Sequence, residues 1–186
     1  MMENKIVFAG PVGAGKTTAI GSVSDILVVG TEARASDEVA QRKNTTTVAM
    51  DYGILNLEGG AKVHLYGTPG QERFSFMWDI LSEGAMGLVI LIDSARPDPM
   101  ADLELYLDSF RDTIRKCEGA VVIGVTRTEL NPYQVDLLDR VNERLAQRKL
   151  NVPVFEVDGR QRDDVKQMLL ALLTFFDPST SRSKAA

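Results

Sequence analysis

Apolar positions along the chain fall into short continuous runs that alternate with stretches of helical spacing. Runs of this length are typical of strands that are buried on both faces of a sheet. They predict strands over residues 5–9, 48–57, 62–66, 86–93, 120–125 and 153–157. Helices are expected over 18–23, within a loop region at 71–82, and over 102–116, 132–148 and 163–176.

The order of these elements predicts an α/β fold. Gly59 and Gly60 mark a turn between the second and third strands, which indicates an antiparallel hairpin. The other strands alternate with helices, which favours parallel pairing with helices on both faces of the sheet. We therefore expect about six strands, mostly parallel, with one antiparallel edge strand. One domain is expected over 1–177, followed by a flexible polar tail over 178–186.

A phosphate-binding loop follows the first predicted strand. Residues 10–17 match the spacing G-x-x-x-x-G-K-[ST]. The glycines let backbone N–H groups point at phosphate oxygens, while Lys16 reaches the terminal phosphates and the Thr17 hydroxyl binds Mg²⁺. With its strand and helix, the loop predicts the three-layer fold of P-loop NTPases. The residues expected to contact the nucleotide here are Gly10, Pro11, Val12, Gly13, Ala14, Gly15, Lys16, Thr17 and Thr18.

Composition and charge exclude several classes of function. The chain has 186 residues and a formal net charge of −5, which argues against non-specific nucleic-acid binding. The single cysteine, Cys117, allows neither an intrachain disulfide nor a zinc cluster, and it suits the reducing cytoplasm. No apolar run reaches the roughly 18 residues that a membrane span needs. The signals for secretion, myristoylation and prenylation are missing as well, so we expect no direct membrane anchor.

The order of motifs resembles the Ras-superfamily small GTPases over residues 5 to about 176. The match is densest in the phosphate loop and in residues 69–74, Pro-Gly-Gln-Glu-Arg-Phe, which resemble the second switch of those proteins. Within the superfamily the chain looks most like the bacterial branch that includes the MglA-type gliding-motility GTPases. The resemblance implies a cytoplasmic molecular switch that binds GTP or GDP with Mg²⁺.

Family roles can be carried over to matching positions. Gln71 matches the glutamine that orients the attacking water, and the Gly70 N–H is expected to contact the γ-phosphate. Thr47 matches the first-switch threonine that binds Mg²⁺, although Thr45 and Thr46 fit equally well as β-branched residues that begin a strand. The resemblance thus implies Lys16, Thr47 and Gln71 as catalytic residues and Thr17 and Thr47 as metal ligands. Trp78 is expected to pack under the second switch.

The chain departs from the family in ways that bear on activity. Small GTPases usually carry an aspartate where this chain has Gly67, and the MglA-like branch also lacks it. We expect weaker Mg²⁺ binding or faster nucleotide loss as a result. Val12 can crowd the transition state, and Thr46 stands where MglA-type proteins have an arginine that acts on the γ-phosphate. These departures predict slow intrinsic hydrolysis that depends on a partner protein.

The base of the nucleotide is expected to meet two further loops. Residues 126–129, Thr-Arg-Thr-Glu, stand where small GTPases have N/T-K-x-D. A carboxylate there accepts the two adjacent N–H groups of guanine, and Arg127 can stack on the base. Residues 158–160 stand where S-A-K is usual. The predicted base-contacting residues are Thr126, Arg127, Glu129, Asp158, Gly159 and Arg160.

The leading hypothesis is a slow GTPase that acts as a molecular switch in bacterial signalling or cell polarity. By family analogy its regulator or effector is a protein, and a roadblock-type dimer is the candidate. A nucleotide-binding scaffold with little hydrolysis is a second hypothesis, favoured by Gly67, Val12 and Glu129. The irregular base-reading loop leaves an ATP-directed P-loop protein as a third.

Overall fold

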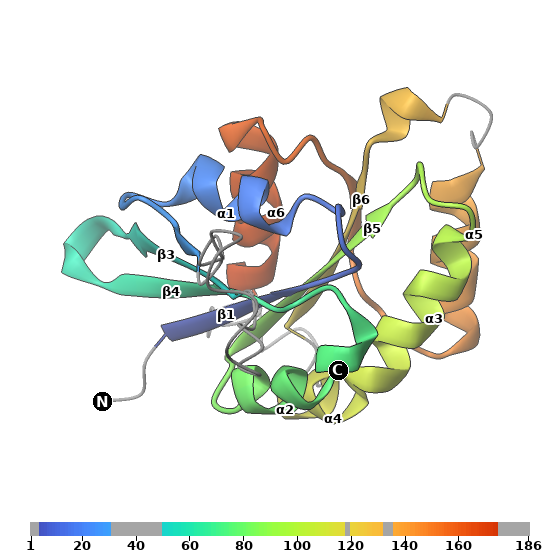
Figure 1. Cartoon of the computed structure of the whole chain (residues 1–186), viewed down its shortest axis with the longest axis horizontal. Helices are drawn as coiled ribbons and strands as arrows, with labels where there is room; N and C mark the ends of the chain where they lie inside the picture. Colours follow the sequence, from blue (N-terminus) through green and yellow to red (C-terminus); the bar gives the residue numbers. More distant parts are fainter. Residues whose placement is uncertain (1–3, 31–49, 118–119, 132–135, 175–186) are drawn as a thin grey trace, which may run out of the picture.

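The computed structural model describes residues 4–30, 50–117, 120–131 and 136–174 (Figure 1). Thr45, Thr46 and Thr47 lie outside these ranges, and so does the predicted tail over 178–186. The predicted first-switch threonine, the domain boundary at residue 177 and the tail therefore stay predictions.

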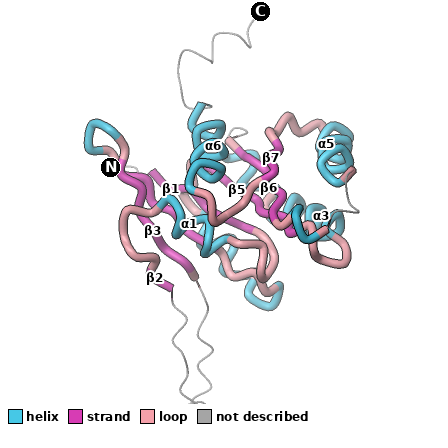
Figure 2. Tube along the Cα trace, turned by 90° about the horizontal axis from the view of Figure 1, so that it is seen from above, coloured by secondary structure: helices cyan, strands magenta, loops and turns pink. Residues whose placement is uncertain are grey.

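The described residues form a seven-stranded sheet of order β2-β3-β4-β1-β5-β6-β7. Figure 2 shows it running from β2 and β3 on one side to β6 and β7 near α5 on the other. Strand β1 pairs in parallel with β4 and β5, and β5, β6 and β7 continue the parallel part. The strands are β1 (Asn4–Ala9), β2 (Val29–Gly30), β3 (Asp51–Asn56), β4 (Lys62–Gly67), β5 (Gly87–Asp93), β6 (Val121–Thr126) and β7 (Val154–Glu156).

The antiparallel part of the sheet differs in one respect from the prediction. The expected hairpin is present, since β3 pairs antiparallel with β4 across a short 3-10 helix at Glu58–Gly60. However, the prediction of about six strands missed β2, which pairs antiparallel with β3 and makes β3 the second strand from the edge. Strand β2 has only two residues, both exposed, so it leaves no apolar run in the sequence.

Helices cover both faces of the sheet (Figure 1). Alternate strand residues supply the two cores, as Val7 and Ile90 pack with α2, α3 and α5 on one face. Phe8 and Leu91 pack with α1 and α6 on the other. The helices are α1 (Lys16–Val23), α2 (Phe76–Ser82), α3 (Pro99–Ser109), α4 (Arg111–Lys116), α5 (Leu137–Gln147) and α6 (Arg162–Leu173).

The helix predicted over 102–116 is wrong in its extent, because the chain forms two helices there. Asp98 caps α3 by accepting the Ala101 N–H at 2.9 Å, and Pro99 occupies the first turn. Phe110 separates α3 from α4 with φ −99° and ψ 15°. Its buried ring stacks on Trp78 at 5.6 Å between centroids, so core packing sets the position of the break.

The carboxyl ends of the parallel strands meet at one edge of the sheet, where ligands of α/β folds bind. The phosphate loop leaves β1 there, and the segments that begin at Gly67, Asp93 and Thr126 leave β4, β5 and β6 at the same edge. The predicted α/β, three-layer P-loop fold is confirmed. Among the described helices, none has the length and apolar character required to cross a membrane.

Candidate functional site

The phosphate loop lies tightly against the sheet. Gly10 has φ +145°, and a Cβ atom built there would lie 2.3 Å from the Leu91 carbonyl oxygen of β5. No other residue fits this position, because both the backbone conformation and the backbone neighbour exclude a side chain. The loop closes on itself through the Ala14 N–H, which donates to the Pro11 carbonyl at 3.2 Å. The sequence motif thus forms a rigid turn at the amino end of α1.

Lys16 is held inside this turn. Its side chain is buried, and Nζ donates to the carbonyls of Gly10 at 2.7 Å and Pro11 at 2.8 Å. An ammonium group has three N–H donors, so one remains for a phosphate oxygen. Burial lowers the pKa of Lys16 to about 8, and the nearby Asp51 carboxylate opposes that shift. The charge is therefore already desolvated and fixed in position before a ligand binds.

Thr17, the predicted metal ligand, has a partner that the sequence did not suggest. Its exposed hydroxyl donates to Asp51 Oδ2 at 2.6 Å. Asp51 is half-buried on β3 and pairs directly with Gly67 of β4. Hydroxyl and carboxylate oxygens are the ligands Mg²⁺ prefers, so this donor set fits that ion. Within the described ranges no group of three His, Cys, Asp or Glu side chains forms a metal cage, and P-loop sites hold Mg²⁺ with few protein ligands plus phosphates.

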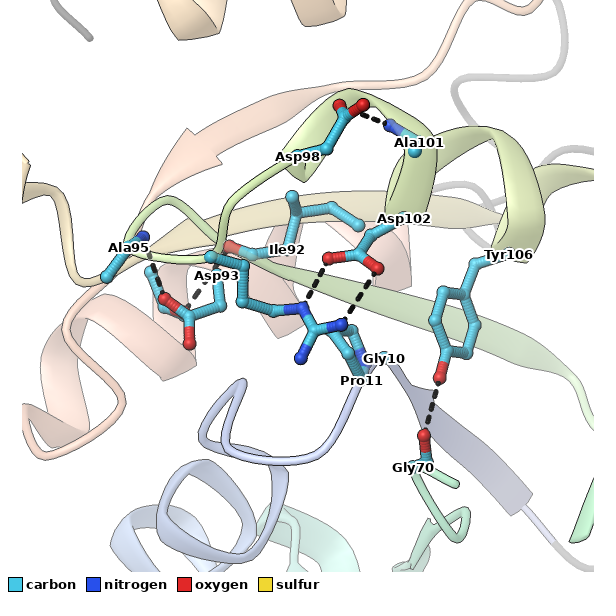
Figure 3. A network of polar contacts seen from close by, with 12 residues as sticks. Gly10, Pro11, Gly70, Ile92, Asp93, Ala95, Asp98, Ala101, Asp102 and Tyr106 are labelled. Carbon is cyan, nitrogen blue, oxygen red and sulfur yellow. Dashed lines mark hydrogen bonds and ion pairs between the residues drawn. The ribbon is translucent and has the colours of Figure 1, made fainter. Parts of the chain in front are cut away.

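The second switch is seated on the phosphate loop. A Cβ atom at Gly70 would lie 2.4 Å from the Val12 nitrogen and 2.7 Å from the Pro11 carbonyl carbon, so only glycine permits this contact. Tyr106 reaches from α3 and donates to the Gly70 carbonyl at 3.3 Å (Figure 3). Beneath them Trp78 is buried and donates to the Pro69 carbonyl at 2.7 Å. The prediction that Trp78 packs under this segment is confirmed.

Gln71 follows Gly70 directly, but its side chain is hydrogen-bonded within its own loop. Its side chain is exposed, and Oε1 accepts from Arg73 Nε at 2.7 Å. Val12 is 54% exposed at the tip of the phosphate loop. Of the three predicted catalytic residues, the structure places Lys16 inside the loop and Gln71 at its edge, while Thr47 lies outside the described residues. The hydrogen bond with Arg73 thus holds the Gln71 amide oxygen in this arrangement.

A cavity of about 340 Å³ joins the phosphate loop to the predicted base-reading loops. This volume is in the range of small-molecule sites. The structure brings together in it all six predicted base-contacting residues, and it adds Leu130 and Val157, which the sequence analysis did not select. The lining residues are Ala14, Gly15, Thr18, Thr126, Arg127, Glu129, Leu130, Val157, Asp158, Gly159 and Arg160.

Thr126 ties the two halves of the cavity together. Its buried hydroxyl lies 3.0 Å from the Ala14 carbonyl of the phosphate loop and 3.3 Å from the Ile92 carbonyl of β5. Arg127, predicted to stack on the base, adopts φ +58°, and its guanidinium contacts Asp93 Oδ2 at 3.3 Å. Asp93 also accepts the Ala95 N–H at 2.9 Å. It therefore acts here as a loop-ordering and ion-pairing residue.

Charged groups line the far end of the cavity. Arg160 donates to Glu129 at 3.2 Å and to both carboxylate oxygens of Asp158 at 2.8 to 3.1 Å. This guanidinium, and the Arg160 backbone N–H at 2.9 Å, lower the pKa of Asp158 to about 2. Glu129 thus presents a carboxylate that is already paired with an exposed arginine. A ligand that offers N–H donors to Glu129 competes with Arg160.

Comparisons with known proteins support nucleotide binding. A family model described as "conserved hypothetical ATP binding protein" matches residues 28–180, which begin after the phosphate loop. An uncharacterized protein of Methanocaldococcus jannaschii is 32% identical over 103 residues, covering 55% of this chain and 59% of that protein. The chain therefore spans less than two thirds of the length of that relative.

Two further relatives are eukaryotic. The GTP-binding protein ypt1 of Schizosaccharomyces pombe is 26% identical over 147 residues, covering 75% of this chain and 68% of that protein. The Ras-related protein RabC of Dictyostelium discoideum is 24% identical over 187 residues, covering 98% and 88%. These relatives support the Ras-like resemblance without supporting its bacterial branch. The chain belongs to the family described as conserved hypothetical ATP binding protein, and it has a P-loop fold and sequence similarity to Ras-related GTP-binding proteins.

Proposed function

We propose that this protein is a molecular switch that binds guanine nucleotide together with Mg²⁺ and hydrolyses GTP slowly. The observation that carries the proposal is a cavity lined both by the phosphate loop and by the loops that follow β6 and β7. The adjoining contact between Gly70 and the phosphate loop links that site to the second switch, the segment that changes conformation in the proposed function. The phosphate loop, the predicted base-reading loops and the predicted second switch therefore meet at one edge of the sheet.

The phosphate end is built for an anionic group. Lys16 holds its charge at the loop with one N–H donor to spare, and the N–H groups that begin α1 face the same end. Mg²⁺, when bound, neutralises phosphate charge, and Thr17 is the described residue that would hold it. Phosphoryl transfer requires mainly positioning and charge stabilisation, so these groups supply what the chain can contribute.

The base end favours guanine through Glu129. A carboxylate accepts both N–H groups on one edge of guanine, whereas adenine offers one donor beside an acceptor nitrogen. Each charge-assisted bond contributes about 1.5–3 kcal/mol, which corresponds to roughly 10- to 100-fold in affinity. The description of the matched family favours ATP as the second candidate ligand. Direct comparison of the two nucleotides decides between them.

Slow hydrolysis follows from the state of Gln71. Its amide oxygen accepts from Arg73 and the side chain is exposed, so this arrangement does not hold Gln71 in place to orient a water, and we expect it to move in order to act. A protein regulator that binds the second switch can supply that movement, and a roadblock-type partner is the candidate that family analogy suggests. The proposal also includes membership of the bacterial MglA-like branch, a role in signalling or cell polarity, and a location in the cytoplasm. If no partner releases Gln71, the protein acts as a nucleotide-binding scaffold.

The decisive experiment identifies the nucleotide that copurifies with the protein. Denatured protein should release guanine nucleotide, measured by chromatography, and titration calorimetry should give tighter binding of GTP than of ATP. Lys16→Ala should abolish both signals, while Lys166→Ala on the exposed face of α6 should retain them. Glu129→Gln should erase the preference for GTP, and Glu143→Gln on α5 should not. A preference for ATP in the wild-type protein would replace guanine with adenine in the proposal.

A further inference from the structure

Asp51 and Gly67 face each other across the hairpin of β3 and β4. A Cβ atom at Gly67 would lie 2.9 Å from Asp51 Oδ2 and 3.0 Å from Asp51 Cβ. Real Cβ atoms of directly opposite residues stay about 4.5–5.5 Å apart. A side chain at residue 67 and the observed side chain at residue 51 therefore exclude each other. Because Gly67 has no side chain, the Asp51 carboxylate has the space to occupy this position.

That carboxylate reaches the phosphate loop. Asp51 Oδ2 accepts the Thr17 hydroxyl proton at 2.6 Å, although 34 residues separate the two in the sequence. A hydroxyl that donates its proton in a fixed direction leaves its oxygen lone pairs facing the other way. Such outer contacts orient the groups that bind a metal and increase its affinity. The same carboxylate acts electrostatically on Lys16, so its charge is felt inside the loop.

We propose that Asp51 replaces, from the neighbouring strand, the carboxylate that residue 67 lacks, and that it positions the Thr17 hydroxyl and supplies negative charge for Mg²⁺ binding. This inference rests on the proposed function, since it concerns the same phosphate site. It changes the expectation drawn from Gly67 alone, because the protein keeps a carboxylate at the site and only its position in the chain has moved. Asp51 is thus a positioning residue for the metal.

The test measures how Mg²⁺ retains a bound nucleotide. Protein loaded with fluorescent GDP is mixed with excess unlabelled GDP at graded free Mg²⁺ concentrations, and the release rate gives the Mg²⁺ concentration of half-maximal retention. Asp51→Asn should raise that concentration at least tenfold and leave the release rate in EDTA within about twofold of wild type. Asp112→Asn, an exposed carboxylate on α4, is the matched control and should leave both unchanged. Mn²⁺ binding followed by electron paramagnetic resonance gives the same comparison without measuring hydrolysis.

An exchange of the two residues tests the relocation itself. Gly67→Asp alone should fold poorly, since the new side chain meets Asp51 and the end of Ile20. The double variant Asp51→Gly, Gly67→Asp removes the main clash, and it should bring the Mg²⁺ requirement back to within about threefold of wild type. Circular dichroism checks that each measured variant is folded.

The outcomes separate this inference from the function on which it rests. Wild-type protein that retains nucleotide in a Mg²⁺-dependent manner, together with an unshifted Asp51→Asn, would overturn the role of Asp51 and leave the proposed function intact. A double variant that folds but needs as much Mg²⁺ as Asp51→Asn would overturn the relocation. Wild-type protein that retains no nucleotide at any Mg²⁺ concentration would overturn the proposed function and this inference with it.

Discussion

Replacing Trp78 with phenylalanine tests how firmly the second switch is anchored to the core. The indole is 2% exposed, stacks near Tyr106 and Phe110 with centroids at 5.0 and 5.6 Å, and donates to the Pro69 carbonyl at 2.7 Å. Phenylalanine keeps an aromatic ring in the cluster but has no N–H group. The substitution therefore removes one hydrogen bond and part of one buried surface while it leaves the backbone unchanged.

The expected loss of stability has two parts. Pro69 is buried, and leaving its carbonyl without a donor costs about 1–3 kcal/mol. The smaller ring leaves roughly 40 Å² of apolar surface unfilled, which is about 1 kcal/mol at 25 cal/mol/Å². We expect the free energy of unfolding to fall by about 2–4 kcal/mol, which is a large share of the roughly 5–15 kcal/mol typical of a domain.

Urea denaturation followed by far-ultraviolet circular dichroism measures this change, because the variant lacks the chain's single tryptophan as a fluorescent probe. Phe76→Leu, at an aromatic residue of α2 that is 58% exposed, serves as the control and should change stability by less than about 0.5 kcal/mol. A loss below about 0.5 kcal/mol for Trp78→Phe, with an unchanged denaturant slope, would refute the idea that this hydrogen bond anchors the switch.

Three further predictions follow from the same structure. Gly10→Ala should destabilise the protein by more than about 3 kcal/mol in thermal unfolding, whereas Gly84→Ala, also at positive φ but with open space around it, should cost only about 1 kcal/mol; equal losses would contradict the steric argument. Hydrogen bonds from Arg148 and Arg111 lower the pKa of Asp108 to about 2, so its contribution to stability is present above the ordinary value near 3.8 and disappears as pH falls toward 2. Denaturant midpoints of wild type and Asp108→Asn should therefore differ at pH 6 and converge near pH 2, and a gap independent of pH would contradict this. Burial raises the pKa of the Cys117 thiol to about 11, so a disulfide reagent at pH 8 should label the folded protein at least roughly tenfold more slowly than the urea-unfolded protein.

Features encoded locally were predictable from the sequence. The phosphate loop depends on glycines and a lysine within eight consecutive positions, and the buried strands depend on continuous apolar runs. The predicted cavity residues could be found because they stand at or after the carboxyl ends of predicted strands, at the edge of the sheet where ligands bind. Leu130 and Val157, the latter at the end of the strand predicted over 153–157, were missed because apolar side chains carry no chemical signal of their own.

Features that depend on pairing between distant segments were not predictable. The contact of Asp51 with Thr17 requires the register that sets Asp51 opposite Gly67, and no local pattern gives that register. The break at Phe110 arises from stacking on Trp78, which belongs to another helix. The hydrogen bond from Arg73 to Gln71 depends on the conformation of their loop, and a match to a sequence motif does not predict that conformation.

The contacts of the Thr126 hydroxyl bear on the length of the ligand that the cavity can hold. By contacting the carbonyls of Ala14 and Ile92 together, it fixes the phosphate loop and the base loops to the ends of the central strands. The distance between the phosphate loop and the predicted base-reading loops is then held by the central strands, which pair at a regular spacing. For the proposed nucleotide ligand, we therefore expect analogues with an altered sugar or a shortened linkage to bind more weakly. In the proposed nucleotide cycle, any change of shape then falls on segments other than the phosphate loop and the base-reading loops.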